Sequence, residues 1–299
     1  MKISGIYTCF NRKEKTLRSL KSLFDAHEQH QLASNSTFEL VVYLTDDGST
    51  DGTAEAVAAK FPQVKILKAK GDLFWAEGMR NSWKAALKEG YDAYLLLNDD
   101  VELYQNLFPE LLKTDSYCRE TLGKPGICIG ATEDKAKKTL TYSGSIILNK
   151  FLYTQKRLTP NGDFQECELA NANIMFVPNE VVTQIGILSE GYSHGIADYD
   201  YSLTANRNGI PVIIAPEYLG HCENDHADIY EDFSKLSLKE RRNKLYKPTG
   251  LAYESYLKYM KKFFPLRYPM LVLAGWLKLY FPGFYVNVLS RKNRYRTQP

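Results

Sequence analysis

The first hundred residues alternate short apolar runs with longer segments of helical periodicity. The apolar runs cover residues 3–10, 38–44, 64–70 and 93–97. A run that is apolar along most of its length fits a strand buried on both faces, which is typical of a parallel sheet covered by helices. The sequence therefore predicts an α/β domain whose sheet lies between two layers of helices.

A helix is expected between the first two runs. Leu17, Leu20 and Phe24 recur at helical spacing and mark the face that packs on the sheet. Asn11, followed by Glu14 three residues later, has the spacing of a capping box at the start of a helix. We therefore expect this helix to begin directly after the first strand.

Polar residues follow each of the four apolar runs. In chain order they are Asn11, Asp46 and Asp47, Gly71 and Asp72, and Asn98, Asp99 and Asp100. Asn and Asp are ordinary turn residues, so one such group carries little information. Four of them at the carboxyl ends of parallel strands share the edge where open α/β sheets bind ligands. Converging carboxylates suit a hard divalent cation that also binds phosphate, which predicts a metal and diphosphate site.

Composition excludes several classes of protein. The chain has 299 residues, of which 44% are hydrophobic and 24% charged, as in a soluble globular protein. A net charge of +3 is too mild to indicate nucleic-acid binding. The five scattered cysteines include no CxxC pair, which favours reduced thiols over a disulfide framework or a zinc site. The first residues lack a signal-peptide pattern, so a cytoplasmic location is expected.

Three motifs resemble the nucleotide-binding half of the family 2 glycosyltransferases. They are TCFNR, TDDGSTDGT and LLLNDDV, and residues 171–223 are similar to the acceptor half of the family. The resemblance implies a GT-A fold, a Rossmann-like mixed sheet flanked by helices, over residues 1–225. Residues 1–103 are expected to form the nucleotide half and 104–225 the acceptor half, with a helical extension over 226–299.

The resemblance also implies which residues hold the nucleotide. They are Thr8, Phe10 and Asn11 at the base and ribose, Asp46 and Asp47 at the pyrimidine ring, and Asp72, Arg80 and Asp99 elsewhere along the nucleotide. An acceptor facing a ring N–H prefers uracil or thymine, which favours UDP- or dTDP-linked donors. The alternatives are a core aromatic at Phe10, a cap on the helix after Gly48 for the two Asp residues, and a solvated Arg80.

A metal-binding motif maps by resemblance to residues 98–100. Asp100 is expected to carry the contact to Mn²⁺ or Mg²⁺, with Asp99 as second choice and Asn98 in place of the usual first Asp. His221 stands where many members of the family have a further ligand, and a structural role is the alternative. The metal would offset the charge of the leaving nucleoside diphosphate.

The resemblance places the catalytic base at Asp198, in a segment where Ala197 replaces a common Glu. In an inverting transfer one base deprotonates the acceptor hydroxyl as it attacks the sugar. Asp200 is expected to orient or cap the following helix. The QxxRW motif of processive synthases is absent, so addition of a single sugar is favoured.

The last part of the chain interleaves basic clusters with aromatic residues. Its most apolar segment, 269–286, is interrupted by Lys278 and Pro282 and falls short of a membrane-spanning helix. The composition is typical of an interfacial helix on anionic lipid, at the inner face of the cell membrane. The alternatives are a helical hairpin packed on the catalytic domain and an oligomer interface, as in a homodimer.

Together these features predict an inverting glycosyltransferase that acts on a glycan or lipid-linked saccharide in cell-surface polysaccharide synthesis. Two other functions stay open at this point. One is a sugar-nucleotide-binding protein without turnover, and the other is a nucleotidyltransferase, although its Gly-rich GxGTRL start is absent. A receiver-like signalling domain is disfavoured by the length of the chain and by the lack of a lysine at a strand end.

Overall fold

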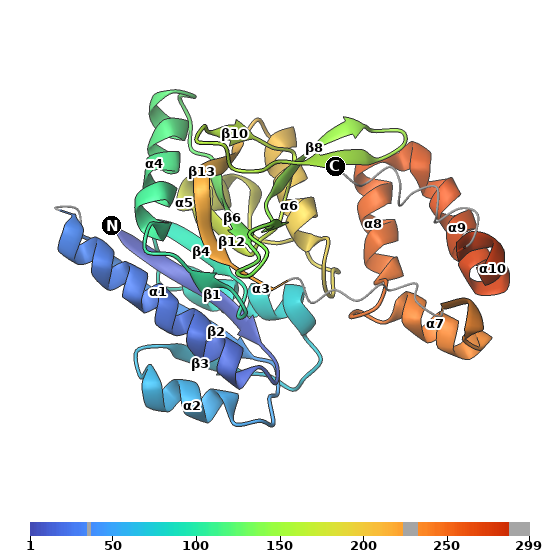
Figure 1. Ribbon diagram of the computed structural model, residues 1–299, viewed down its shortest axis with the longest axis horizontal. Helices are drawn as coiled ribbons and strands as arrows, with labels where there is room; N and C mark the ends of the chain where they lie inside the picture. Colours follow the sequence, from blue (N-terminus) through green and yellow to red (C-terminus); the bar gives the residue numbers. More distant parts are fainter. Residues whose placement is uncertain (35–36, 224–232, 287–299) are drawn as a thin grey trace.

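A computed structural model describes residues 1–34, 37–223 and 233–286 (Figure 1). Its main sheet runs in the order β10-β13-β6-β12-β4-β1-β2-β3, with β5 on β13 and β7 on β6. The strands of this sheet are β1 (Lys2–Cys9), β2 (Glu39–Asp46), β3 (Lys65–Lys68), β4 (Ala93–Leu97), β5 (Glu102–Leu103), β6 (Ile127–Glu133), β7 (Leu140–Tyr142), β10 (Gln165–Glu166), β12 (Ile174–Pro178) and β13 (Val212–His221). A smaller sheet contains β8 (Gly144–Asn149), β9 (Thr154–Arg157) and β11 (Leu169–Ala170).

The four predicted strands pair in parallel, in the order β3-β2-β1-β4. β12 then runs antiparallel to both β4 and β6, so the whole sheet is mixed. Cys9 pairs with Asp46, and Asp46 with Lys68, so the carboxyl ends of these strands lie level. The predicted α/β fold with a mixed sheet is confirmed, and its register brings the polar strand ends to one edge.

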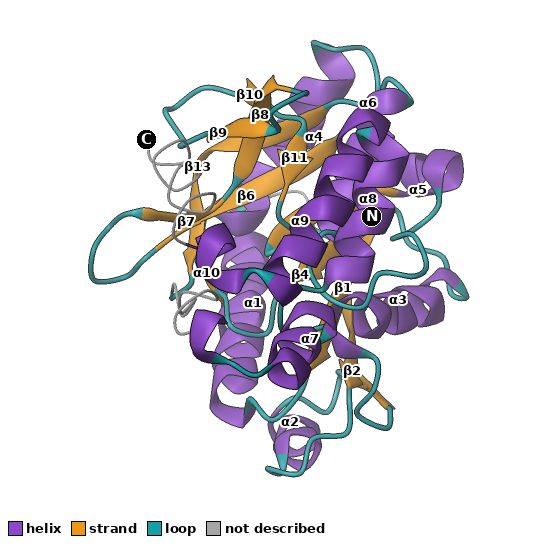
Figure 2. Cartoon of the chain, turned by 90° about the vertical axis from the view of Figure 1, so that its right-hand side faces the viewer, coloured by secondary structure: helices purple, strands orange, loops and turns teal. Residues whose placement is uncertain are grey.

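Helices cover both faces of the sheet (Figures 1 and 2). They are α1 (Lys13–Ala33), α2 (Thr53–Lys60), α3 (Phe74–Leu87), α4 (Leu107–Glu120), α5 (Asn179–Ile185) and α6 (Ala197–Arg207). Leu95 and Leu97 of β4 pack in the core with α1, α2 and α4, whereas Tyr94 and Leu96 pack with α3, α5 and α6. This alternation explains why β4 had to be apolar along its whole length.

The predicted capping box at Asn11 is wrong. Helix α1 begins at Lys13 and its N-cap residue, Arg12, makes no side-chain cap. Asn11 has a left-handed backbone (φ 51°), and its side-chain oxygen accepts a hydrogen bond from the backbone N–H of Thr50. The side chain is therefore committed to the neighbouring turn after β2 and cannot reach the first turn of α1.

The C-terminal helices lie on one side of the α/β core (Figure 1). They are α7 (Leu238–Tyr246), α8 (Tyr253–Phe263), α9 (Tyr268–Tyr280) and α10 (Pro282–Phe284), with short 3₁₀ turns at Phe233–Lys235 (η1) and Pro265–Arg267 (η2). Within the described residues, no helix is long and apolar enough to cross a membrane.

Helix α8 packs directly on the α/β core. Tyr259, Met260 and Phe263 share an apolar cluster with residues of α3 and α6. Lys262 donates to both carboxylate oxygens of Asp200, at 2.8 and 3.0 Å. Helix α8 therefore fits the alternative in which the extension packs on the core. Asp200 anchors this helix through Lys262 and does not cap α6.

We predict that Asp200→Asn destabilises the fold by about 1–3 kcal/mol, because its fully buried carboxylate also accepts hydrogen bonds from Ser189 and Tyr192. Denaturant unfolding measures the loss, and limited proteolysis should show the extension released first. Asp25→Asn is the matched control, since Asp25 is exposed and paired only with Lys21 on the surface of α1. Equal stability of the two variants would contradict the anchoring role.

Candidate functional site

A cavity of about 320 Å³ opens at the carboxyl ends of β1, β2 and β4. Its lining residues come from the turns after these strands, from the start of α3, from the loop before α6 and from the loop between α7 and α8. They are Thr8, Cys9, Phe10, Arg12, Asp47, Gly71, Phe74, Trp75, Asp99, His194, Lys247 and Thr249. Of the residues predicted for the site, the cavity includes Thr8, Phe10, Asp47 and Asp99.

Phe10 and Thr8 form one wall of the cavity. Phe10 is 52% exposed and lines the cavity, so the alternative of a core aromatic is wrong. Thr8 is buried, and its hydroxyl donates to the carbonyl of Thr45 at 3.2 Å. Helix α3 approaches so closely that a Cβ at Gly78 would lie 2.2 Å from the Thr8 hydroxyl, so only glycine fits there.

Asn11 and Asp46 do not line the cavity but shape the turn beside it. The backbone N–H of Asn11 donates to the Ser49 hydroxyl at 2.9 Å, and Asp46 Oδ1 accepts from the Ser49 N–H at 3.0 Å. Both residues therefore hold the turn after β2 against the turn after β1. Their expected contacts with a nucleotide stay predictions.

Asp47 caps a helix, but not the one after Gly48. Its carboxylate accepts hydrogen bonds from the backbone N–H groups of Gly71, Leu73 and Phe74, at 2.8–3.2 Å. These groups lead into α3, so Asp47 sets the position of Phe74, whose left-handed backbone (φ 54°) is unusual for a bulky residue. Asp72, in the same loop, is exposed and does not line the cavity.

Arg80 is neither solvated nor part of the cavity lining. Its side chain is buried and pairs with Glu77 at 2.8 Å and with Glu190. Because Glu190 lies in the loop before α6, the arginine ties α3 to that loop. Ser193, in the same loop, accepts a hydrogen bond from the backbone N–H of Ala76, which adds a second tie.

Asn98 positions an aromatic residue of the cavity. Its side-chain oxygen accepts a hydrogen bond from the indole N–H of Trp75 at 2.7 Å. This hydrogen bond gives a structural reason for the neutral amide of Asn98 at the first position of the acidic motif. Trp75 lines the cavity, and no sequence pattern singled it out.

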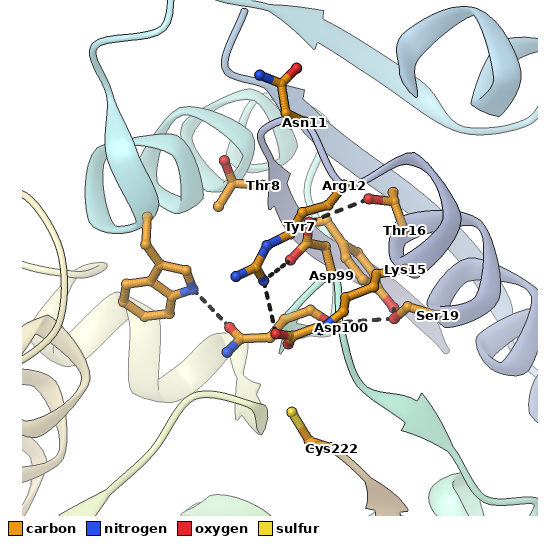
Figure 3. A network of polar contacts seen from close by, with 12 residues as sticks. Tyr7, Thr8, Asn11, Arg12, Lys15, Thr16, Ser19, Asp99, Asp100 and Cys222 are labelled. Atoms are coloured by element: carbon orange, nitrogen blue, oxygen red, sulfur yellow. Dashed lines mark hydrogen bonds and ion pairs between the residues drawn. The ribbon is translucent and has the colours of Figure 1, made fainter. Parts of the chain in front are cut away.

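The two adjacent carboxylates of the motif share one arginine (Figure 3). Arg12 Nη1 lies 3.2 Å from Asp99 Oδ1 and 2.8 Å from Asp100 Oδ2, and Thr16 donates to the other oxygen of Asp99 at 3.3 Å. Burial raises the pKa of the Asp99 carboxyl to about 7, although the charge of Arg12 acts in the opposite direction. A buried strand can therefore end in two acids because a guanidinium compensates them.

The donor set around Asp100 fits a divalent cation only in part. Asp100 Oδ1 is buried and has no hydrogen-bond partner among the described residues. Across those same residues, no three His, Cys, Asp or Glu side chains come together as a metal cage. Mg²⁺ and Mn²⁺ can be held by one or two carboxylates if substrate phosphates and water complete the shell. The residues present fit a cation bound together with a diphosphate.

His221 has a partner of its own. Its Nε2 lies 3.2 Å from a carboxylate oxygen of Glu102, and its ring packs near Tyr104 at a centroid distance of 5.9 Å. The contact joins β13 to β5, which pair beside it. The Nε2 nitrogen is buried and makes no hydrogen bond within the described residues, so the structural role and the role as a metal ligand both stay predictions.

Asp198 lies in the first turn of α6 and outside the cavity lining. Its two oxygens accept hydrogen bonds from the backbone N–H groups of Tyr199, at 2.8 Å, and Ala172, at 3.3 Å. Burial raises the pKa of this carboxyl. The preceding Ile196 has φ 79°, a strained backbone for a β-branched residue, and such strain clusters at functional sites.

Sequence reasoning missed the contribution of the extension. Lys247 and Thr249 come from the loop between α7 and α8, yet they line the same cavity as Phe10 and Trp75. Nothing in the basic tail distinguishes Lys247 from its neighbours. Only the packing of α8 on the core brings this loop to the cavity.

We predict that Arg12→Gln destabilises the metal-free protein by about 1–3 kcal/mol at about pH 8, since two carboxylates lose their cation and Arg12 is only half-buried. The folded pKa of Asp99 exceeds its unfolded value of about 3.9, so its ionised form costs stability as pH rises. The loss should therefore shrink near about pH 5, where Asp99 is protonated, and Mn²⁺ should partly reverse it at about pH 8.

Urea unfolding at both pH values, with and without Mn²⁺, measures these effects. Arg18→Gln is the matched control, because Arg18 pairs with Glu102 at the surface. If the two variants are equally stable at the higher pH, Arg12 does not compensate the carboxylates.

The comparisons with known proteins agree with this geometry. The sequence model described as Glycosyl transferase family 2 matches residues 4–164, whereas no curated protein matches the chain. S. aureus TarS, residues 1–349 in complex with UDP, has a TM-score of 0.53 at 15% identity, over 99% of this chain and 78% of that chain. The mannosyltransferase PcManGT from Pyrobaculum calidifontis, in complex with GDP-Man and Mn²⁺, has a TM-score of 0.52 at 13% identity, over 94% of this chain and 70% of that chain. At such identities the likeness shows the fold, and with the family match over more than half of the sequence it leads to one conclusion: the chain belongs to glycosyltransferase family 2.

Proposed function

We propose that this chain is an inverting enzyme that moves one sugar from a UDP- or dTDP-linked donor to a hydroxyl of a glycan or lipid-linked saccharide. The observation that carries the proposal is the cavity at the strand ends, which combines the exposed Phe10 with the ion pair of Arg12 and Asp99. Asp100 does not line the cavity but contacts the same arginine. A nucleoside diphosphate needs both features, a flat apolar surface for the base and fixed charges near the phosphates.

The nucleotide end of the donor would lie between the turns after β1 and β2. Phe10 offers its ring for stacking, which contributes on the order of 1–3 kcal/mol per base. Both contacts of the Asp46 carboxylate fall on Oδ1, so Oδ2 can accept the ring N–H of uracil or thymine. The relatives with UDP and with GDP-Man bind different bases, so the preference depends on Asp46 of this chain.

Positive charge for the diphosphate would come from three sources. Arg12 and Lys247 line the cavity and can donate to phosphate oxygens. A divalent ion held by Asp100 would stabilise the leaving nucleoside diphosphate by charge compensation. A relative solved with Mn²⁺ supports the choice of metal.

Asp198 would accept the proton of the attacking hydroxyl. A carboxyl whose pKa is raised by burial is a better base near neutral pH than an exposed one. Its two backbone hydrogen bonds fix the orientation of the carboxylate relative to α6. His194, which does line the cavity, is the second candidate for this role.

Two other functions remain as alternatives, a sugar-nucleotide-binding protein without turnover and a nucleotidyltransferase. Release of free nucleoside diphosphate only when an acceptor is present supports transfer. Binding without release would indicate the first alternative, and release of pyrophosphate the second.

We further propose that the enzyme works in cell-surface polysaccharide synthesis, as a peripheral protein at the inner face of the cell membrane. The basic and aromatic composition of the extension supports this location. A homodimer formed through the extension is the competing explanation for its exposed apolar side chains.

For the metal, we predict that UDP binds about tenfold or more tightly with Mn²⁺ than with EDTA, since a contact to a charged group is typically worth about 1.5–3 kcal/mol. Asp100→Ala should abolish that gain, because it removes a buried carboxylate oxygen at the end of β4 that has no hydrogen-bond partner among the described residues. Calorimetric titration of UDP measures both affinities. Equal affinity of the wild type with and without metal would refute the assignment.

For the base, we predict that Asp198→Asn lowers kcat about 10²–10⁴-fold while UDP affinity stays unchanged. In the wild type, the acid limb of the rate profile should lie above about pH 4, because burial raises the pKa and the base must be ionised. Asp200→Asn is the comparison variant, because it should lower the free energy of unfolding while it changes kcat less than Asp198→Asn does. Near-normal transfer by Asp198→Asn would move the role to His194.

A further inference from the structure

The extension exposes a large apolar surface. Its exposed members, between 43% and 80% accessible, are Leu266, Met270, Val272, Leu273, Trp276, Tyr280, Phe281 and Phe284. Large apolar patches of this kind mark interaction sites on soluble domains. They lie on η2, α9 and α10 and at the turn between α9 and α10. Helix α9 packs on α7 and α8, η2 packs on α8, and α10 packs on α9 and η1.

A second exposed apolar group lies at the tip of the hairpin formed by β8 and β9. Leu148, Phe151 and Leu152 are 62%, 57% and 43% exposed, in a part of the chain far from the extension in sequence. No motif pointed to this hairpin, because in sequence it is only a short loop between two strands.

Tertiary contacts bring the hairpin tip and the extension together (Figure 1). The guanidinium of Arg267 donates to the carbonyl of Phe151, and the hydroxyls of Tyr153 and Tyr259 lie 2.8 Å apart. The ring of Tyr153 also packs on Phe264 at a centroid distance of 4.9 Å. The two apolar groups are therefore neighbours, and we call them together the docking surface.

The charged residues in the segments that carry the docking surface are basic. The described residues 255–286 contain five Lys and Arg (Lys258, Lys261, Lys262, Arg267 and Lys278) and no Asp or Glu. The hairpin adds Lys150, Lys156 and Arg157, all exposed, and residues 144–162 contain no acid. A partner for this surface must accept apolar side chains and supply negative charge.

We propose that the docking surface binds an anionic lipid bilayer, with the β8–β9 hairpin tip and α9–α10 as two separate points of insertion. Aromatic residues with adjacent cations are suited to the boundary between headgroups and acyl chains. A second copy of the chain would bring two strongly basic segments together, which mutual repulsion opposes. Helix α9 has 13 residues, about 20 Å, so it lies on the bilayer and does not cross it.

Two points of insertion fix an orientation, whereas one helix alone leaves the molecule free to rotate. The loop between α7 and α8 links the docking surface to the donor cavity through Lys247 and Thr249. The orientation would therefore hold the cavity close to the headgroups, where a lipid-linked acceptor presents its hydroxyl. This last step rests on the proposed function, but lipid binding itself does not.

The test is co-sedimentation of the full chain with vesicles of phosphatidylcholine, with or without phosphatidylglycerol. We expect binding to the anionic vesicles only, weakened but not abolished by high salt, because screening acts on charges and not on apolar insertion. The double variants Phe151→Ser with Leu152→Ser, and Leu273→Ser with Trp276→Ser, should each lower partitioning about tenfold or more. Leu32→Ser is the matched control, since Leu32 is 78% exposed on α1 and outside the docking surface.

The outcomes separate the proposal from its alternatives. If the wild-type protein does not sediment with anionic vesicles at low salt, lipid binding is overturned. If the protein is then found to be a dimer, and the same double variants make it a monomer, the docking surface binds a second copy of the chain. A hairpin variant that binds like the wild type overturns the two-point arrangement. UDP affinity and thermal stability are measured for every variant, because a loss of lipid binding with intact UDP binding concerns the docking surface and not the transferase.

Discussion

The contact of Arg12 with Asp99 and Asp100 is the interaction on which the site depends. It joins the turn after β1 to the end of β4, and it places a cation where buried carboxylates would otherwise repel each other. The arginine occupies one oxygen of each carboxylate and leaves Asp100 Oδ1 without a hydrogen-bond partner. The same contact therefore stabilises the site and leaves one carboxylate oxygen, Asp100 Oδ1, that could accept a hydrogen bond from a ligand or coordinate a cation.

Around this contact, most polar residues of the motifs bind the protein itself. Asp47 holds the loop before α3, Asn98 holds Trp75, and Asn11 holds the turn after β2. Of these three residues Asp47 also lines the cavity, whose lining further includes Phe10, Trp75, Arg12 and Lys247. Such a division is physically reasonable, because side chains that contact a ligand need rigid support from groups whose own hydrogen bonds are satisfied within the fold.

The extension packs on the α/β core. Lys262 reaches the buried Asp200, and α8 completes an apolar cluster that includes residues of α3 and α6. Because of this packing, the loop after α7 lines the cavity at the strand ends, and α9 presents exposed apolar side chains. The packing of α8 therefore connects this cavity to the proposed docking surface.

The sequence by itself determined the class of fold, the four parallel strands and the edge where the polar residues gather. These follow from local rules, since apolar runs, helical periodicity and strand-end turns depend on neighbours along the chain. It could not tell ligand contacts from internal ones. The alternative for Asp47 was a cap on the helix after Gly48, whereas its carboxylate holds the loop before α3, and the alternative of a solvated Arg80 is wrong because the side chain is buried. Asp200 was expected to orient or cap a helix, whereas it anchors α8 through Lys262. Trp75, Lys247 and the hairpin tip at Phe151 carried no local signal. Tertiary structure decided their roles, because each depends on contacts between segments that lie far apart in sequence, and such contacts form only when the whole core packs.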